Sequence, residues 1–332
     1  MSHPTPDLFF ETAQAYQRTA ALRSAIDLEI FTAISEGAST APALAARCSA
    51  PERGVRILCD YLTIVGMLSK TGDTYQLTPE SAVFLNKRSP AYLGGMIEFL
   101  GSPSIVRNFD NLTAIVRRGS VTEQESAVAE ENPIWETFAR AMVPMMMPLS
   151  QGIADVLDVP STGQMRVLDI AAGHGVFGIA LAQRNPQAEI VAVDWAGVLK
   201  VASENALKMG VGARHRIVPG NAFNVDWGTG YDVALVTNFL HHFDRETCTG
   251  LLRKIADSLK PGGRVAVLEF VPNDDRVSPP MAASFAIQML AGTPAGDAYT
   301  FRELGAMLSA AGFSGMTRHP LQGPQILIVG RK

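Results

Sequence analysis

Cysteine is scarce in this chain, which has three, Cys48, Cys59 and Cys248, among its 332 residues. An odd number of widely spaced cysteines fits neither a disulfide framework nor a zinc site, so we expect free thiols in a reducing cytoplasm. Long apolar runs are also missing, and none approaches the roughly 18 residues that a membrane span needs. The start, MSHPTPDLFFETAQAY, lacks the basic stretch and apolar core of a signal peptide. The sequence therefore predicts a cytoplasmic protein without a membrane partner.

The chain also lacks an excess of basic charge. Lys and Arg number 28 against 32 Asp and Glu, a formal net charge of −4. Proteins that bind nucleic acid neutralise phosphates with clustered basic residues, and this balance gives no sign of such a partner. The chain is instead 47% hydrophobic and 18% charged, as folded globular proteins are, and its length suits two domains.

The first part of the chain, residues 8–100, is expected to be mainly helical. Apolar residues recur at helical spacing over 22–34, and Gly37 then ends that helix. The segment 51–68, PERGVRILCDYLTIVGML, has the same apolar spacing behind an N-terminal proline. Two short strands around 71–73, in LSKTGDTYQLT, predict a hairpin.

Helix, turn, helix and hairpin together form the winged-helix pattern, which raises a DNA-binding hypothesis. Across 51–68 the only basic residues are Arg53 and Arg56, and the hairpin adds only Lys70. A DNA-binding surface needs several phosphate contacts, each from a positive group. We therefore favour dimerisation as the role of this module.

Residues 104–160 are expected to form connecting helices. Within them, PIWETFARAMVPMMMPLSQGIADVL combines methionines with aromatic residues. Methionines commonly fill gaps in a core, and a methionine-rich wall also suits an adaptable apolar pocket, so both interpretations stay open. Because Pro144 and Pro148 interrupt the segment, we do not expect an uninterrupted buried helix.

From residue 165 onward, short apolar runs alternate with segments of helical length. The runs are MRVLDI, AEIVAVDW, RHRIVPG, YDVALVTNF and GRVAVLEFV. This alternation predicts a parallel sheet with crossover helices. The chain closes with a helix, TFRELGAMLSAAG, and strands around FSGMTRHP and PQILIVGRK.

The loop after the first of these strands, residues 169–178, is DIAAGHGVFG, and its last six residues match G-x-G-x-x-G. A glycine turn followed by an acid at the end of the second strand, here Asp194, serves dinucleotides and S-adenosylmethionine alike. Asp169 separates the two, because a nearby carboxylate repels a pyrophosphate and attracts a sulfonium and an ammonium. The loop therefore favours S-adenosylmethionine over NAD.

Polar side chains follow the next strands at the same edge of the sheet. Asn221, in GNAF, can accept a hydrogen bond from adenine, although a turn asparagine is equally compatible with the sequence. NFLHHF follows the fourth strand and provides Asn238, His241 and His242. SLKPGGRVAVLEF provides a helix end, a Pro-Gly-Gly turn and a strand ending in Glu269. Open α/β sheets keep their chemistry at this carboxyl edge.

In this order and spacing, VLDIAAGHG, VAVDW, NFLHHFDRETCTGLLRKI and LKPGGRVAVLEF resemble the class I S-adenosylmethionine-dependent methyltransferases. More narrowly, the chain resembles O-methyltransferases with an N-terminal winged-helix dimerisation domain, such as plant caffeate-type enzymes and bacterial secondary-metabolite tailoring enzymes. The resemblance covers nearly the whole chain. It implies an α/β fold with a Rossmann-like seven-stranded sheet, its last strand antiparallel, and a homodimer formed through the N-terminal domain.

The resemblance also implies a domain organisation. We expect a winged-helix-like dimerisation domain over 1–103, connecting helices that contribute to the pocket over 104–160, and the S-adenosylmethionine-binding domain over 161–332. The implied donor is S-adenosylmethionine, with S-adenosylhomocysteine as product and no metal.

Residue roles follow from the same resemblance. The implied cofactor residues are Asp169, Gly173, Gly175, Asp194, Trp195, Asn221, Ala222, Phe223, Asn238, Phe138 and Met142. The implied substrate residues are Met145, Met146, His242, Phe285, Met289 and Thr293. His241 takes the place of the general base and Glu269 that of the glutamate orienting it. A second family glutamate is replaced by Ala298, with Asp297 beside it.

These roles predict methyl transfer to a hydroxyl, most simply a phenolic one, of a small and largely apolar molecule. A histidine suits the base because its ordinary pKa of about 6.5 lies near working pH. The altered His-His-Phe motif and the missing glutamate leave an alternative: carbon or nitrogen methylation, or use of S-adenosylmethionine without methyl transfer. More distant hypotheses are an S-adenosylmethionine-sensing transcription regulator and a nicotinamide dehydrogenase.

Overall fold

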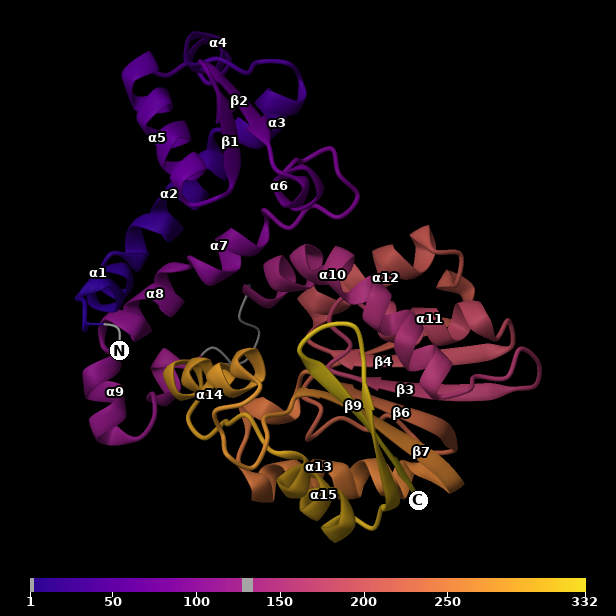
Figure 1. Cartoon of the computed structure of the whole chain (residues 1–332). Coiled ribbons are helices and arrows are strands. Elements are labelled where there is room, and N and C mark those ends of the chain that lie inside the picture. The colour runs from indigo at the N-terminus through magenta and orange to yellow at the C-terminus, as the bar shows by residue number, and fades with distance from the viewer. Residues whose placement is uncertain (1–2, 127–133) are drawn as a thin grey trace. The chain divides into compact units, whose positions relative to one another are not determined.

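The structure, a computed structural model, describes residues 3–126 and 134–332 (Figure 1). It divides into two compact units, Met1–Glu98 and Phe99–Lys332. This division lies near the boundary predicted at residue 103, and the helices predicted over 104–160 belong to the second unit. Among the described residues, no helix is both long and apolar enough to cross a membrane.

The first unit consists of short helices and one hairpin, as predicted. Its elements are α1 (Asp7–Ala13), α2 (Ala15–Asp27), α3 (Ile30–Ser35), α4 (Ala41–Arg47), α5 (Glu52–Ile64), β1 (Leu68–Thr71), β2 (Thr74–Leu77) and α6 (Pro79–Phe84). Thr71 pairs with Thr74, which leaves Gly72 and Asp73 as the two-residue turn. The core of this unit contains the fully buried side chains of Phe31, Leu44 and Tyr75.

The prediction of a single helix over 22–34 is wrong, because the helical conformation is interrupted between Asp27 and Ile30. Glu29 has a φ of 54°, in the left-handed region, and this conformation ends the regular helical path. The change of direction buries both Ile30 and Phe31 in the core. Burial of two large apolar side chains outweighs one strained residue.

The second unit contains the seven-stranded sheet. Its strands are β3 (Met165–Ile170), β4 (Ala188–Asp194), β5 (His215–Pro219), β6 (Tyr231–Thr237), β7 (Leu259–Phe270), β8 (Ser314–Pro320) and β9 (Gln325–Arg331). Their order is β5-β4-β3-β6-β7-β9-β8, and the first five of these are parallel. The last strand in the chain, β9, runs antiparallel to both neighbours, which confirms the prediction. The strand order reverses between β3 and β6, so their carboxyl ends open a crevice for a ligand.

Helices cover both faces of this sheet (Figure 1). The helices of this unit are α8 (Pro103–Asp110), α9 (Leu112–Arg118), α10 (Ile134–Val156), α11 (Val176–Arg184), α12 (Ala196–Lys208), α13 (Arg245–Ser258), α14 (Pro280–Gly292) and α15 (Phe301–Ala310), and α7 (Met96–Leu100) spans the boundary between the two units in the sequence. Helices α10, α11 and α12 lie over one face, and α13 and α15 over the other. Two-sided coverage explains why the central strands are apolar at nearly every position.

Helix α10 is continuous, so the predicted interruption at Pro144 and Pro148 is wrong. Each proline removes one backbone hydrogen bond, a local cost of about 3 kcal/mol. The helix nevertheless buries a long apolar face that includes Met146, Leu149 and Ile153. The stabilisation from this burial comes from tertiary contacts, which the local sequence pattern does not show.

The Pro-Gly-Gly turn predicted near residue 261 lies inside β7 as an irregularity. Tyr231 pairs with Leu259, whereas Val233 already pairs with Arg264, so extra residues of β7 have no partner in β6. Gly262 adopts a φ of 77° there. The glycine therefore serves a bulge in a long strand rather than a turn before a shorter one.

Gly178 on α11 allows a prediction about packing. A Cβ atom there would lie 2.8 Å from Ile190 Cγ2 and 2.9 Å from Asp169 Oδ2. We expect Gly178→Ala to lower the free energy of unfolding by about 1–3 kcal/mol, because neither neighbour can withdraw from a packed sheet. Gly250→Ala on α13, where nothing lies within 4 Å, should be neutral or stabilising by up to about 1 kcal/mol. Urea unfolding of both variants measures the difference, and equal effects would contradict it.

Candidate active site

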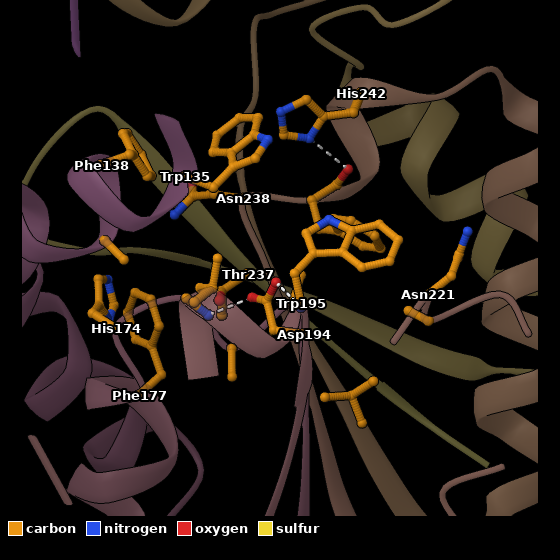
Figure 2. Close-up of a pocket in the computed structure, with 18 of the residues that line it drawn as sticks. Trp135, Phe138, His174, Phe177, Asp194, Trp195, Asn221, Thr237, Asn238 and His242 are labelled. Carbon is orange, nitrogen blue, oxygen red and sulfur yellow. Dashed lines mark hydrogen bonds between the residues drawn. The ribbon is translucent and has the colours of Figure 1, made fainter. Parts of the chain in front are cut away.

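A cavity of about 220 Å³ lies at the carboxyl ends of β3, β4 and β6. It is lined by Trp135, Phe138, Ala139, Ala171, Ala172, Gly173, His174, Phe177, Val193, Asp194, Trp195, Val198, Gly220, Asn221, Ala222, Phe223, Thr237, Asn238, Phe239, His242 and Phe243. The crevice predicted by the strand order is therefore a real hollow, mostly apolar, with few polar groups. Figure 2 shows Asp194 between His174 and Phe177 on one side and Asn221 on the other.

The glycine loop after β3 forms one wall of the cavity. Gly173 has a φ of 57° and its N–H donates to Asp194 Oδ2 at 2.8 Å. Gly175 has a φ of 75° and precedes α11, and a Cβ there would lie 3.0 Å from Ala202 Cβ. Gly173 lines the cavity, whereas Gly175 does not. The second glycine therefore serves the backbone turn and helix packing.

Asp194 is the acid at the centre of the cavity. Each carboxylate oxygen accepts one backbone N–H, from Gly173 at 2.8 Å and from Trp195 at 2.7 Å (Figure 2). Burial raises the pKa of Asp194 to about 6. The carboxylate is thus held in one orientation with lone pairs left for a ligand that donates hydrogen bonds.

Asp169 lies beneath the loop rather than in the cavity. Its side chain is fully buried, Oδ2 accepts the N–H of Gly178 at 3.2 Å, and Oδ1 has no hydrogen-bond partner within the described chain. Burial raises the pKa of Asp169 well above its ordinary value, and the nearby Asp194 raises it further. Asp169 does not line the cavity, whereas Asp194 does, so the structure does not support the direct contact with the cofactor that we expected from Asp169.

The loop after β5 lines the end of the cavity that Asn221 marks. The N–H of Phe223 donates to Asn221 Oδ1 at 2.9 Å, which closes an Asx turn. Asn221 is therefore a turn asparagine, one of the two interpretations that the sequence left open. One lone pair of its Oδ1 atom already accepts the N–H of Phe223. Phe223 packs edge-on against Phe243, with ring centroids 4.9 Å apart, and with Trp195 and Phe239 these rings make an apolar wall.

Helix α10 provides the wall at the other end. Trp135 and Phe138 line the cavity, and Trp135 also packs edge-on against the ring of His242, with centroids 5.5 Å apart. Of the predicted residues on this helix, Met142 and Met146 are buried behind that wall, and Met145 is 39% exposed. Helix α10 thus contributes Trp135 and Phe138 to the cavity and Met142 and Met146 to the core.

Glu269, at the end of β7, organises the segment that follows β6. Its Oε1 atom accepts the backbone N–H groups of Phe239 (3.0 Å), Leu240 (2.8 Å) and His241 (3.4 Å). These groups begin the 3₁₀ turn η3 (Leu240–His242). The Oε2 atom lies 2.5 Å from His241 Nδ1. A carboxylate can only accept hydrogen bonds, so Nδ1 of His241 donates to Oε2 of Glu269. In the neutral imidazole the lone pair therefore lies on Nε2.

The two histidines of η3 have different surroundings. His241 is 4% exposed, lies off the cavity lining, and packs edge-on against Phe285 with centroids 4.8 Å apart. His242 lines the cavity, and its Nδ1–H donates to the carbonyl of Phe239 at 3.1 Å. Burial, followed by the neighbouring His241, holds the pKa of His242 well below its usual value. His242 is therefore a neutral group whose Nε2 accepts hydrogen bonds.

Ala298 stands where the family resemblance implies a second glutamate, so this position provides no carboxylate. Ala298 is buried, and the carboxylate of Asp297 pairs with Arg276 at 3.0 Å. The backbone N–H of Asp297 donates to the carbonyl of His241 at 3.0 Å. Orientation of His241 thus depends on Glu269.

The remaining predicted residues are divided between the cavity and the adjoining structure. Asn238 lines the cavity, with a φ of 53° and its Oδ1 accepting from Gln325 Nε2 at 3.3 Å. Phe285 stacks on Phe270, Met289 is buried, and Thr293 borders a second, shallower hollow. In the described part of the chain, no three His, Cys, Asp or Glu side chains gather as a metal site requires.

Sequence reasoning missed several lining residues, of which His174 is the most polar. Burial lowers the pKa of His174 to about 4, and its Nδ1 accepts the N–H of Val176 at 3.2 Å. It lies inside the glycine motif, so its position was a usable signal. Thr237 and Val193 each directly precede a predicted residue at the end of a strand, where backbone and side chain both face the crevice.

Comparison with known proteins identifies the family. A model of the O-methyltransferase domain matches residues 132–314, and a model of the O-methyltransferase dimerisation domain matches residues 10–87. The first match alone covers more than half of the chain. The chain therefore belongs to the O-methyltransferase family, and the enzyme is an S-adenosylmethionine-dependent O-methyltransferase.

Individual relatives agree with this assignment. A protein of Nostoc punctiforme assigned to the O-methyltransferases has a crystal structure that superimposes with a TM-score of 0.94, at 50% identity over 100% of both chains. The 3-hydroxy-5-methyl-1-naphthoate 3-O-methyltransferase of Streptomyces sahachiroi is 27% identical over 93% of this chain and 90% of its own. The L-tyrosine C(3)-methyltransferase of Streptomyces lavendulae is 27% identical over 91% of this chain and 85% of its own.

The Glu269 arrangement leads to a prediction about stability. Glu269→Gln places an amide NH₂ toward either three backbone N–H groups or the Nδ1–H of His241, so donors must face donors. We expect the free energy of unfolding to fall by about 1–3 kcal/mol. Glu246→Gln, an exposed glutamate in the first turn of α13, should cost less than about 1 kcal/mol. Urea unfolding measures both, and a Glu269 variant as stable as the Glu246 variant would refute the role.

Proposed function

We propose that the cavity binds S-adenosylmethionine and that the enzyme methylates a phenolic hydroxyl of a small, largely apolar molecule. The observation that carries this proposal is the pair of fixed groups, Asp194 within the cavity and the His241–Glu269 couple at its edge. The relative from Streptomyces sahachiroi, whose name specifies a hydroxynaphthoate and its 3-hydroxyl, supports the class of acceptor. When bound, the donor supplies an electrophilic methyl group on a positively charged sulfur.

The residues of the cavity fit the nucleoside part of this donor. The oriented carboxylate of Asp194 can accept hydrogen bonds from both ribose hydroxyls. The rings of Trp195 and Phe223 offer apolar faces to adenine. Trp135 and Phe138 close the cavity at the side of His242 and exclude water from it. Gly173, Asn221, Ala222 and Asn238 also line the cavity. We propose that they contact the cofactor, as the family resemblance implies.

His241 is the base in the proposed reaction. Its Nε2 lone pair takes the proton of the acceptor hydroxyl, and the carboxylate of Glu269 stabilises the resulting imidazolium through Nδ1–H. The rings of His241 and His242 have their centroids 4.2 Å apart, and within the described chain the His242 ring donates to the backbone carbonyl of Phe239. An imidazolium at His241 would oppose a second positive charge on His242, so the proton taken from the acceptor is proposed to stay on His241, which has the carboxylate beside it.

The acceptor is proposed to approach His241 from the side of α14. Phe285 packs on the ring of His241 and is the side chain whose position best supports contact with an aromatic acceptor. His242 would accept a hydrogen bond from it. Met145, Met146, Met289 and Thr293 remain proposed neighbours on the basis of the family resemblance.

Carbon methylation is the second candidate, and the relative from Streptomyces lavendulae, named for C(3) methylation of tyrosine, is the observation that favours it. A phenolate formed by the same base can react at oxygen or at a ring carbon. Incubation with ¹³C-methyl S-adenosylmethionine and a panel of phenols and naphthols separates the candidates. A methyl carbon resonance of a methoxy group supports the proposal, and an aryl-methyl resonance refutes it.

The homodimer is also a proposal. The match to a dimerisation domain supports it, as do the exposed apolar side chains near the N-terminus, Leu8 at 75%, Phe9 at 69% and Tyr16 at 69% exposure. Apolar surface of this kind is commonly covered by a partner.

The assignment of the base predicts different behaviour for the two histidines. We expect His241→Ala to lower kcat by about 10²–10⁴-fold and to leave the Kd for S-adenosylhomocysteine within about threefold. His242→Ala should lose less activity, because that ring is not paired with a carboxylate. Steady-state kinetics and calorimetry measure both quantities, and a larger kcat loss in the His242 variant would reverse the assignment.

The raised pKa of Asp194 predicts pH-dependent cofactor binding. Hydroxyl donors favour the ionised carboxylate, so binding lowers this pKa and releases a proton. Affinity for S-adenosylhomocysteine should therefore rise about tenfold from pH 5 to pH 7 and level off above. In Asp194→Asn, affinity should be weaker and independent of pH over this range. Calorimetry at several pH values tests this, and a parallel pH profile in the variant would remove Asp194 from the ribose.

A further inference from the structure

The cavity wall formed by the loop after β5 ends in backbone carbonyls that have no backbone partner. Asn224 and Val225 both donate their N–H groups to the carbonyl of Asn221, at 2.9 and 3.0 Å, which makes a single helical turn. A turn that stops there leaves the carbonyls that follow without N–H donors, as at the end of any helix. Buried or half-buried carbonyls require donors from elsewhere.

Lys254 on α13 supplies them. Its ammonium donates to the carbonyls of Ala222 (3.0 Å), Phe223 (3.1 Å) and Val225 (2.7 Å). An ammonium has three protons, so one side chain satisfies three carbonyls of one loop. The same nitrogen lies 3.9 Å from the ring centroid of Trp227, a buried side chain at the end of the loop.

The surroundings of this lysine are unusual for a charged residue. Burial lowers the pKa of Lys254, the charge of Asp226 raises it to a smaller extent, and the hydrogen bonds of the ammonium go to carbonyls rather than to a carboxylate. The charge is compensated by carbonyl dipoles and by the face of an aromatic ring. Such an arrangement costs desolvation that a solvated surface lysine avoids, and its structural result is a fixed loop.

We propose that Lys254 is a positioning residue that sets the affinity and the base selectivity of the cofactor site without touching the cofactor. Gly220, Asn221, Ala222 and Phe223 line the cavity, and two of the three carbonyls held by Lys254 belong to this wall. The N–H of Phe223 holds the amide of Asn221, so fixing the backbone of Phe223 also fixes that side chain. This inference depends on the proposed binding of S-adenosylmethionine in the cavity, with adenine against this wall.

The test compares Lys254→Met with Arg253→Met in the full chain. Arg253 is the adjacent residue of α13, is exposed, and donates to the carbonyl of Ala310, away from the cavity. We expect Lys254→Met to raise the KM for S-adenosylmethionine and the Kd for S-adenosylhomocysteine by about tenfold, while kcat at saturation stays within about threefold. The KM for the methyl acceptor should not change. Arg253→Met should match the wild type in all four quantities.

Base selectivity supplies a second measurement. The ratio of the Kd for S-inosylhomocysteine to the Kd for S-adenosylhomocysteine should fall in Lys254→Met. A loosened wall discriminates less between the exocyclic amine of adenine and the carbonyl oxygen that hypoxanthine has in its place. Lys254→Gln keeps a neutral donor and covers the case in which the methionine variant does not fold, with effects in the same direction. An unchanged KM and an unchanged ratio in either folded variant would overturn the inference, as would equal losses in the Arg253 variant. Failure of the wild-type enzyme to bind S-adenosylhomocysteine would instead refute the proposed function.

Discussion

The active site depends on a single buried carboxylate, that of Glu269. One of its oxygens collects three successive backbone N–H groups and the other takes the proton-bearing nitrogen of His241. The first set of bonds forms the η3 turn at the end of β6, and the second fixes which nitrogen of the imidazole is free. Because Glu269 stands at the end of the adjacent parallel strand β7, the register of two strands determines the position of His241, the proposed base. With Ala298 in the place of a second glutamate, no other described carboxylate shares this task.

Asp194 and Asp169 lie at different depths near the cavity, and the difference in depth gives them different roles. Asp194 lines the cavity and is oriented by two backbone N–H groups, whereas Asp169 lies under the glycine loop against α11. Burial raises the pKa of both acids, and the charge of Asp194 further raises the pKa of Asp169. The close fit of Gly178 over Asp169 and Ile190 explains the third glycine of the motif as a packing requirement. The glycine pattern thus serves the backbone turn and helix packing, and of the two acids Asp194 is the one that lines the cavity.

Much of the fold could be predicted from the sequence, because its strongest signals are local. The buried parallel strands are continuous apolar runs, the hairpin turn is Gly72-Asp73, and the antiparallel last strand follows from the family resemblance. Helix α10 could not be predicted as continuous, since the cost of Pro144 and Pro148 is local and the burial that offsets it comes from distant elements. Likewise, sequence order places both Asp169 and His241 at the carboxyl edge of the sheet but contains no information on depth. Lys254 carries no motif, and its role depends on three carbonyls from another segment.

The site combines an apolar cavity with a few polar groups whose orientation is fixed from outside it. Glu269 holds His241, the backbone of Gly173 and Trp195 holds Asp194, and Lys254 holds the loop that carries Asn221 and Phe223. Apart from Trp195, which adjoins Asp194 in the sequence, each supporting group comes from a different part of the chain than the group it supports, so the geometry exists only in the folded protein. Methyl transfer rewards such fixed placement, because two reactants held in line need no reorganisation of their surroundings as charge moves from oxygen to sulfur. The same logic explains why His242, though it lines the cavity, is neutral: within the described chain its ring donates to the carbonyl of Phe239, which can hold the ring in place but offers no charge to stabilise an imidazolium.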